Sequence, residues 1–192
     1  MSTIEALQLV KTEEHVYHLR LPANAGGHRL LLRHVIPADK ECLQQGFEQL
    51  SPASRRLRFL TNMRRLPEQY LSYLTEIDNI NHLAWGAKDL DHHLQGAGIS
   101  RYIRLPEEPK TAEFAVTVLD TYQQKGIGRV LLALLIHSAL EHGIYHFRGF
   151  LNRDNAAIQA LLQPYQPVFR RDHGTILRVE IKLKAATVSW LH

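Results

Sequence analysis

The stretch AEFAVTVLDTYQQKGIGRVLLALLIHSAL, residues 112–140, decides the expected fold. Its β-branched and aromatic start predicts a strand over 113–118, and its apolar end predicts a long helix from about Gly128 to Gly143. Between them lies a turn, residues 123–128, with two glycines that let the backbone approach a ligand closely. Because a helix N-terminus presents unpaired N–H groups and the positive end of the helix dipole, this turn is suited to bind phosphate.

The phosphate-binding motifs of two other protein classes do not fit this turn. A Walker loop needs G-x-x-x-x-G-K-[ST], which the sequence lacks. A dinucleotide fold needs G-x-G-x-x-G, and Leu131 stands where the third glycine belongs. A turn that uses glycine for packing alone, with no ligand, stays open as the alternative.

The remaining pattern, Q-x-x-G-x-G at residues 123–128, resembles the loop with which the GNAT superfamily of N-acetyltransferases binds the pyrophosphate of acetyl-CoA. A second segment, residues 31–60, resembles the start of the acetyltransferase domain in bacterial Pat-type protein lysine acetyltransferases. That family begins with R-x-x-x-P-x-D, continues as a helix, and then reads L-S-P-x-S-x-x-x-R-F. Ser51 is also a plausible helix N-cap, with Pro52 at the first helical position. The matching residues are Arg33, Pro37, Asp39, Leu50, Ser51, Pro52, Ser54, Arg58 and Phe59.

The order of the predicted strands and helices is that of the GNAT fold, and the resemblance covers about residues 29–183. It implies an α/β (α+β) fold with a mixed, mostly antiparallel central sheet of about six to seven strands, splayed between strands four and five and flanked by about four helices. We expect the acetyltransferase domain at 28–184, an N-terminal extension with a possible extra strand at 1–27, and a C-terminal tail at 185–192. Trp190 and Leu191 in the tail are candidates to dock on the domain or on a partner.

The composition is that of an ordinary soluble domain, with 45% hydrophobic and 22% charged residues in a chain of 192. The single cysteine, Cys42, excludes an internal disulfide and fits a reducing compartment. The sequence has neither an apolar run of transmembrane length nor a signal-peptide pattern, so we expect a cytoplasmic protein without a membrane partner. The net charge of +4 suits an anionic cofactor or nucleic acid, but such a charge is more often only that of a soluble surface.

The resemblance implies a line of residues that binds acetyl-CoA. It puts the pantetheine arm in the gap between strands four and five, paired with the main chain, and the pyrophosphate on the glycine turn. Asn155 matches an asparagine that bonds the cofactor arm, and it is also a plausible helix N-cap. The implied cofactor-binding residues are Val116, Val118, Leu119, Gln123, Gln124, Lys125, Gly126, Ile127, Gly128, Arg129 and Asn155.

Acetyl transfer to an amine needs a base, because an ammonium group with a pKa of about 10.4 has no free electron pair at neutral pH. Glu113 is the candidate, since A-E-F-A-V at residues 112–116 matches the Pat-type motif that carries the proposed base. The alternative is a surface or ion-paired glutamate on a strand. Many GNAT enzymes also use a tyrosine as an acid toward the leaving thiolate. Leu162 stands at that place, as in Pat-type members, and Tyr165 is a nearby candidate.

The sequence therefore predicts an acetyl-CoA-dependent N-acetyltransferase that acts by direct attack in a ternary complex, as a monomer or homodimer. Its acceptor is a protein lysine or a small-molecule amine. The alternatives are an inactive CoA-binding regulatory or interaction module and a basic nucleic-acid-binding domain. The arginines between residues 55 and 65 favour a solvated helix face over an anion clamp, and their poor aromatic interleaving argues against nucleic acid. We expect no metal, because the twelve histidines show no ligand spacing and no H-E-x-x-H.

Overall fold

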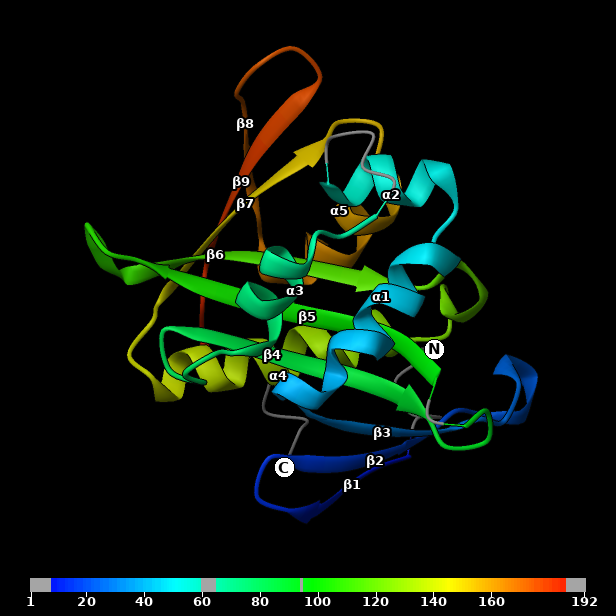
Figure 1. Cartoon of the computed structure of the whole chain (residues 1–192). Coiled ribbons are helices and arrows are strands. Elements are labelled where there is room, and N and C mark those ends of the chain that lie inside the picture. The colour runs from blue at the N-terminus through cyan, green and yellow to red at the C-terminus, as the bar shows by residue number, and fades with distance from the viewer. Residues whose placement is uncertain (1–7, 60–64, 94, 186–192) are drawn as a thin grey trace.

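The computed structural model describes residues 8–59, 65–93 and 95–185, which form one nine-stranded sheet with helices on both faces (Figure 1). In Figure 1, α1 and α3 lie in front of the sheet and α4 lies behind it. The strand order across the sheet is β1-β2-β3-β4-β5-β6-β7-β9-β8. The strands are β1 (Gln8–Glu13), β2 (Val16–Arg20), β3 (Arg29–His34), β4 (His82–Asp89), β5 (Gln95–Leu105), β6 (Glu108–Val118), β7 (His146–Asn152), β8 (Val168–Arg171) and β9 (Ile176–Lys182). The helices are α1 (Lys40–Gln49), α2 (Pro52–Phe59), α3 (Glu68–Thr75), α4 (Ile127–Glu141) and α5 (Ala156–Leu162).

Strands β6 and β7 form the parallel pair of the sheet, joined by helix α4, while the other neighbouring strands run antiparallel. They pair only over residues 111–113 of β6 and 146–148 of β7. Past Glu113, β6 continues to Val118 without β7 as its partner, and β7 pairs on its other side with β9. The expected splay is confirmed here, and it leaves one edge of β6 open.

Helix α4 is buried on nearly all sides, as its apolar sequence predicted. Two hydrogen bonds tie it to the sheet: Trp85 Nε1 donates to Ser138 Oγ at 3.1 Å, and Ser100 Oγ donates to Leu131 O at 2.9 Å. Gly143, at φ 73°, follows its end, as predicted. The helix therefore holds the glycine turn at its start firmly against the sheet.

The sheet has nine strands, where six to seven were predicted. The prediction missed the two edge strands, β1 and β8, because their sequences lack a hydrophobic pattern. The N-terminal extension forms the hairpin β1–β2, where one extra strand was the expectation. Strand β1 is almost wholly exposed, and β8 has only four residues, including Arg170 and Arg171. Such strands are held by main-chain hydrogen bonds to one neighbour, so their sequences show no buried alternation.

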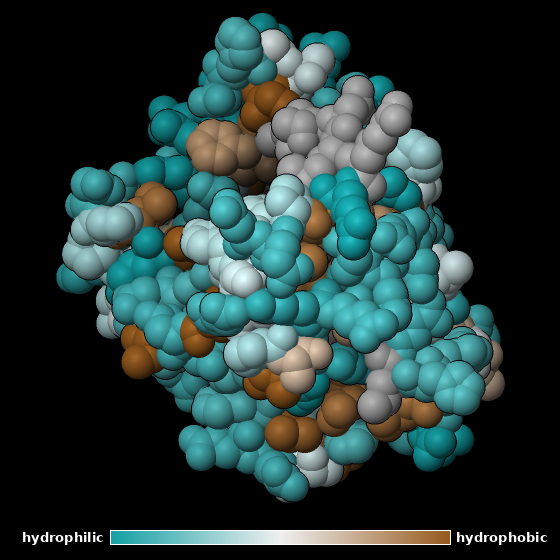
Figure 2. Space-filling model, in the orientation of Figure 1, coloured by the Kyte–Doolittle hydropathy of each residue, from teal (hydrophilic) through white to brown (hydrophobic). Residues whose placement is uncertain are grey.

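The surface drawn in Figure 2 is mostly hydrophilic, with small hydrophobic groups between the polar side chains. Within the described ranges, no helix combines the length and the apolarity needed to span a membrane. Trp190 and Leu191 of the tail, and Arg64 of the basic cluster, lie outside the described residues.

Candidate active site

Phe114 and Gly149 mark the point at which β6 and β7 part. Phe114 is 7% exposed and stacks on Phe147 with the ring centroids 5.1 Å apart. A Cβ on Gly149 would lie 2.9 Å from Cε1 of Phe114, so the ring packs against β7 only because that position is glycine. The aromatic ring therefore fills the fork, and the strands separate beyond it.

A cavity of about 780 Å³ opens at this fork, within the size range of small-molecule sites. Strands β6 and β7, helices α2 and α5 and the glycine turn line it. Of the predicted site residues it brings together Glu113, Val116, Val118, Gln123, Gln124, Gly126, Gly128, Arg129 and Asn155. The residues that line it without having been predicted include Arg58, Tyr70, Thr117, Ala157, Ala160 and Leu161.

The glycine turn has the backbone that an anion-binding helix start requires. Gly126 is the N-cap of α4 at φ 88°, in the left-handed region that glycine adopts without strain. Gly128 has ample room: a Cβ there would lie 3.6 Å from both Leu161 and Val118. The N-terminus of α4 therefore borders the cavity with two residues that have no side chain, which leaves its N–H groups open to a ligand.

Three predicted residues do not line this cavity. Lys125 places Nζ 5.6 Å from the ring centroid of Tyr122, and Ile127 is fully buried in the core. Leu119 donates its N–H to Ala97 O at 3.0 Å and accepts from the N–H of Tyr122 at 2.8 Å. Its main-chain groups thus have partners within the protein, and its side chain lines a second cavity.

Two of the lining side chains also make local hydrogen bonds. Gln123 Nε2 donates to Val118 O at 3.1 Å, which holds the turn against the end of β6. Asn155 Oδ1 accepts from Ile158 N at 3.2 Å, so its N-cap role is confirmed. Arg129 is exposed at the border of the cavity, where it adds positive charge beside the start of α4.

Glu113 is exposed on β6 and lines the cavity. Thr117 lies on the same face of the strand and lines both this cavity and the second one, which lies beneath α1. Arg58 of α2 also lines both. Burial lowers the pKa of Arg58, while the charges of Tyr70 and Glu113 raise it. The Glu113 carboxylate therefore interacts electrostatically with the Arg58 guanidinium, which lies where the two cavities adjoin.

Asp120 ties the segment before the glycine turn to helix α2. Its carboxylate accepts hydrogen bonds from Ser51 N and Ser51 Oγ, each at 3.0 Å, and from Ser54 Oγ at 2.7 Å. Burial raises the pKa of Asp120, but these hydrogen bonds outweigh it and lower the pKa. Ser51 Oγ also accepts from Ser54 N at 3.1 Å, which confirms the predicted N-cap. These contacts fix α2, and Arg58 with it, beside the cavity.

Asp89 fixes Tyr122 at the start of the turn. The fully buried carboxylate accepts from Tyr122 OH at 2.6 Å, and Nδ1 of His28 and of His92 lie 3.0 and 2.9 Å from the same oxygen. In the part of the chain that the structure describes, His28, Asp89 and His92 form a group spaced closely enough to hold a metal ion. Hydrogen bonds to Asp89 account for the arrangement, and we assign no ion to it.

Replacing Tyr122 by Phe should reduce the free energy of unfolding by about 1.5–3 kcal/mol, the usual contribution of a hydrogen bond to a charged group. Burial raises the pKa of Asp89, but the hydrogen bonds, that of Tyr122 foremost, outweigh it and lower the pKa. This stabilisation is therefore present above the unfolded-state pKa of the carboxyl and is lost as the pH falls through the folded-state value. Urea unfolding at pH 7 and at successively lower pH should show the gap between wild type and variant narrowing. Tyr145→Phe, at a side chain 45% exposed, is the control, and equal losses in both variants would contradict the assignment.

The arginine cluster divides into residues with different roles. Arg55 donates to the carbonyl groups of Leu50 and Glu48, each at 2.9 Å, and lies over the ring of Phe47. It therefore closes the end of α1 instead of serving as an anion clamp. Arg58 borders the cavity, whereas the sequence analysis favoured a solvated helix face for the whole cluster.

The acid toward a leaving thiolate stays a prediction. Leu162, at the place of the usual tyrosine, is fully buried. Tyr165 packs against the core, where burial raises its pKa and the charge of Arg129 lowers it.

Comparison with known proteins identifies the family. Residues 51–163 match the model of the Acetyltransferase (GNAT) family. The chain is 36% identical over 136 residues to Acetyltransferase PA5475 of Pseudomonas aeruginosa, which covers 70% of this chain and 71% of that protein. It is 30% identical over 157 residues to Acetyltransferase Pat of Mycolicibacterium smegmatis, covering 81% of this chain and 46% of Pat, so it spans about half the length of that relative.

A solved structure shares the fold. The crystal structure of the GNAT domain of S. lividans PAT matches with a TM-score of 0.79 and 21% identity, over 91% of this chain and 100% of that one. The chain therefore belongs to the GNAT acetyltransferase family and is a Pat-like N-acetyltransferase.

Proposed function

We propose that this protein transfers the acetyl group of acetyl-CoA to a primary amine by direct attack in a ternary complex. The observation that carries the proposal is the cavity at the β6–β7 fork. It joins three features that acetyl transfer needs: the glycine-lined start of α4, the open edge of β6 and the carboxylate of Glu113.

The described residues fit acetyl-CoA. The pyrophosphate would be held by the N–H groups at Gly126 and Gly128 and by the charge of Arg129. The arm would take the open edge of β6 at residues 114–118, whose main chain has no β7 partner. Ala157 and Ala160 of α5 line the cavity with small side chains, and a long side chain at Gly128 would enter the cavity between Leu161 and Val118. Acetyl-CoA supplies the acetyl group as a thioester.

Glu113 would take the proton from the acceptor ammonium, directly or through water. An amine with a pKa of about 10.4 is protonated at neutral pH and attacks only after that loss. Main-chain N–H groups on the open edge of β6 would polarise the acyl carbonyl. We also propose that the reaction takes place in the cytoplasm, in keeping with the single cysteine, Cys42.

Thermal unfolding with and without acetyl-CoA tests the cofactor site. At 100 times the Kd, the ligand should stabilise the protein by about 2.7 kcal/mol, which corresponds to a Tm increase of roughly 5–10 °C at this chain length. Gly128→Glu places a carboxylate where phosphate is expected and should abolish the increase. Gly128→Ala, whose Cβ would make ordinary contacts at 3.6 Å, should retain most of it. No increase in the wild type at millimolar acetyl-CoA would refute the proposal.

A further inference from the structure

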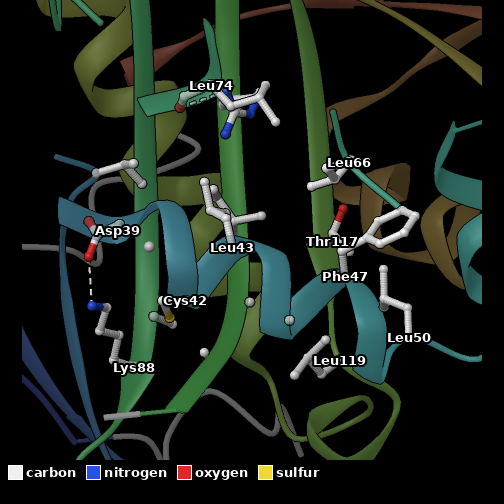
Figure 3. A pocket seen from close by; sticks show the side chains of 18 of the residues that line it. Asp39, Cys42, Leu43, Phe47, Leu50, Leu66, Leu74, Lys88, Thr117 and Leu119 are labelled. Carbon is white, nitrogen blue, oxygen red and sulfur yellow. Dashed lines mark hydrogen bonds and ion pairs between the residues drawn. The ribbon is translucent and has the colours of Figure 1, made fainter. Parts of the chain in front are cut away.

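A second cavity of about 100 Å³ lies beneath helix α1 (Figure 3). Leu43 and Phe47 of α1 line it from above, and Thr117 of β6 and Leu119, the residue after β6, line it from the sheet. Thr117 and Arg58 line both this cavity and the large one. The second cavity therefore adjoins the proposed acetyl-CoA site on the face of the sheet that carries Glu113.

The charged groups around this apolar cavity are mostly cationic. Four basic side chains and one carboxylate line it: Arg33, Arg58, Lys88, Arg101 and Asp39. Asp39 forms ion pairs with Arg33 and Lys88, at 2.8 and 2.6 Å, so these two cations balance the charge of the carboxylate. Arg58 of α2 and Arg101 of β5 lie close enough for the charge of Arg58 to act on Arg101.

Arg101 is 5% exposed and its hydrogen-bond partners among the described residues are neutral. Nη1 donates to Leu74 O at 3.2 Å and lies 3.0 Å from Nε2 of His82. Burial and the charge of Arg101 lower the pKa of His82 to about 4, so this imidazole is neutral at physiological pH. Burial, and next the charge of Arg58, lower the pKa of Arg101 to about 10. A bound anion would offset both the burial of the Arg101 charge and its repulsion by Arg58.

The strand register places Arg101 on the same face of the sheet as the proposed base. Glu113 pairs with Ile103 and Arg101 pairs with Ala115, so Glu113 and Arg101 are diagonal neighbours on one face of the sheet. The Cα atoms of diagonal neighbours are about 7–8 Å apart. Nη1 of Arg101 reaches toward Leu74 of α3 and His82 of β4. Arg58 interacts electrostatically with both Glu113 and Arg101, so its guanidinium connects the proposed base to Arg101.

We propose that the acceptor is a small amine that itself carries a carboxylate, an amino acid in chemical class, and that Arg101 and Arg58 bind this carboxylate beside the amine. The inference rests on the proposed acetyl transfer and narrows its substrate. In the reaction, the N–C bond forms as the acyl C–S bond breaks, Glu113 accepts the amine proton, and the CoA thiolate leaves and is protonated from water. The carboxylate is bound but unchanged, and the apolar wall of Leu43 and Phe47 receives the side chain.

Steady-state acetylation of matched acid and amide pairs tests the proposal. Leucine, methionine and phenylalanine are each compared with their carboxamides, by CoA release and mass spectrometry of the product. The amides have the less basic amine, so a preference for the acid cannot arise from a larger share of free amine. We expect kcat/KM to favour the acids by about 10- to 100-fold, as two charge-assisted contacts would give.

Variants connect the preference to the two arginines. Arg101→Gln and Arg58→Gln should each bring the acid-to-amide ratio of kcat/KM close to one, while Arg101→Lys should keep part of the preference. Arg56→Gln, at an exposed residue of the same helix α2, is the control and should keep the wild-type ratio. If Arg101→Gln does not fold, as judged by its unfolding transition, Arg58→Gln carries the test alone.

The outcomes separate this inference from the proposed function. Wild-type protein that binds acetyl-CoA but acetylates only amides, or only lysines in peptides and proteins, overturns the carboxylate inference and leaves acetyl transfer intact. An acid preference that survives in both glutamine variants also overturns it. Failure to bind acetyl-CoA at all in the thermal experiment removes the proposed function and this inference together.

Discussion

Glu113→Gln is expected to lower kcat/KM for the amine acceptor about 10²- to 10⁴-fold, the usual contribution of general base catalysis. Glutamine has the same shape as glutamate but cannot accept the proton of an ammonium group. The side chain is exposed at the cavity, so the free energy of unfolding should change by no more than about 0.5 kcal/mol. Acetyl-CoA affinity should stay the same, because the proposed pyrophosphate site at Gly126 and Gly128 is separate from Glu113.

Steady-state kinetics and an acetyl-CoA thermal shift on the same preparations provide the measurement. Glu107→Gln is the matched control, since Glu107 is exposed in the turn between β5 and β6. A Glu113→Gln enzyme that retains more than half of the wild-type kcat/KM would show that another group takes the proton. Wild-type protein that binds acetyl-CoA and acetylates no amine would instead support the inactive CoA-binding module.

The site features that sequence analysis identified correctly depend on residues close together in the chain. The left-handed backbone at Gly126 and the start of α4 follow from the glycine turn itself. The cap at Ser51 is completed three residues later by the N–H of Ser54. Asn155 and Ile158 form a second example of the same spacing. Such short-range hydrogen bonds leave a signature in the sequence, so a motif is enough to predict them.

The Pat-type start motif was recognised from its letters, and the structure supplies its physical reason. Arg33 donates two hydrogen bonds of 2.8 Å to the two carboxylate oxygens of Asp39. Pro37 lies in the first turn between them, where its missing N–H costs nothing. The motif therefore encodes an ion pair that closes the connection from β3 to α1.

The features that sequence analysis missed depend on the pairing of distant strands. Arg101 reaches the neighbourhood of Glu113 only through the register of β5 and β6. Tyr122 donates a hydrogen bond to Asp89, and His28 pairs with the same carboxylate, although the three residues lie far apart in the sequence. A charged residue inside an apolar strand, as in Ile99–Ile103, is the one local sign that could have drawn attention to Arg101. Long-range contacts of this kind require the assembled sheet.

Asp39→Asn should lower the free energy of unfolding by about 3–5 kcal/mol at pH 7, the usual cost of breaking a buried ion pair at one partner. Asp39 is buried, and besides Arg33 it accepts hydrogen bonds from Lys88 Nζ at 2.6 Å and from the N–H of Ile36 at 2.9 Å. The amide would leave two cations close together at the second cavity without their counter-charge. Urea unfolding measures the loss, and Asp91→Asn is the control, because the exposed pair of Asp91 and Arg29 is screened by water and should contribute far less.

The dependence of this loss on pH distinguishes the ion pair from a simple packing defect. Burial raises the pKa of Asp39, but the hydrogen bonds from Arg33 and Lys88 outweigh it and lower the pKa from 3.8 to about 2. A carboxyl with a lowered folded-state pKa stabilises the fold fully above its unfolded-state value, and that stabilisation is lost as the pH falls through the folded-state value. The difference between wild type and Asp39→Asn should therefore be constant above about pH 5 and shrink between about pH 4 and pH 2. A difference that stays constant down to pH 2 would mean that shape and hydrogen bonding at Asp39, and not its charge, hold α1 over the second cavity.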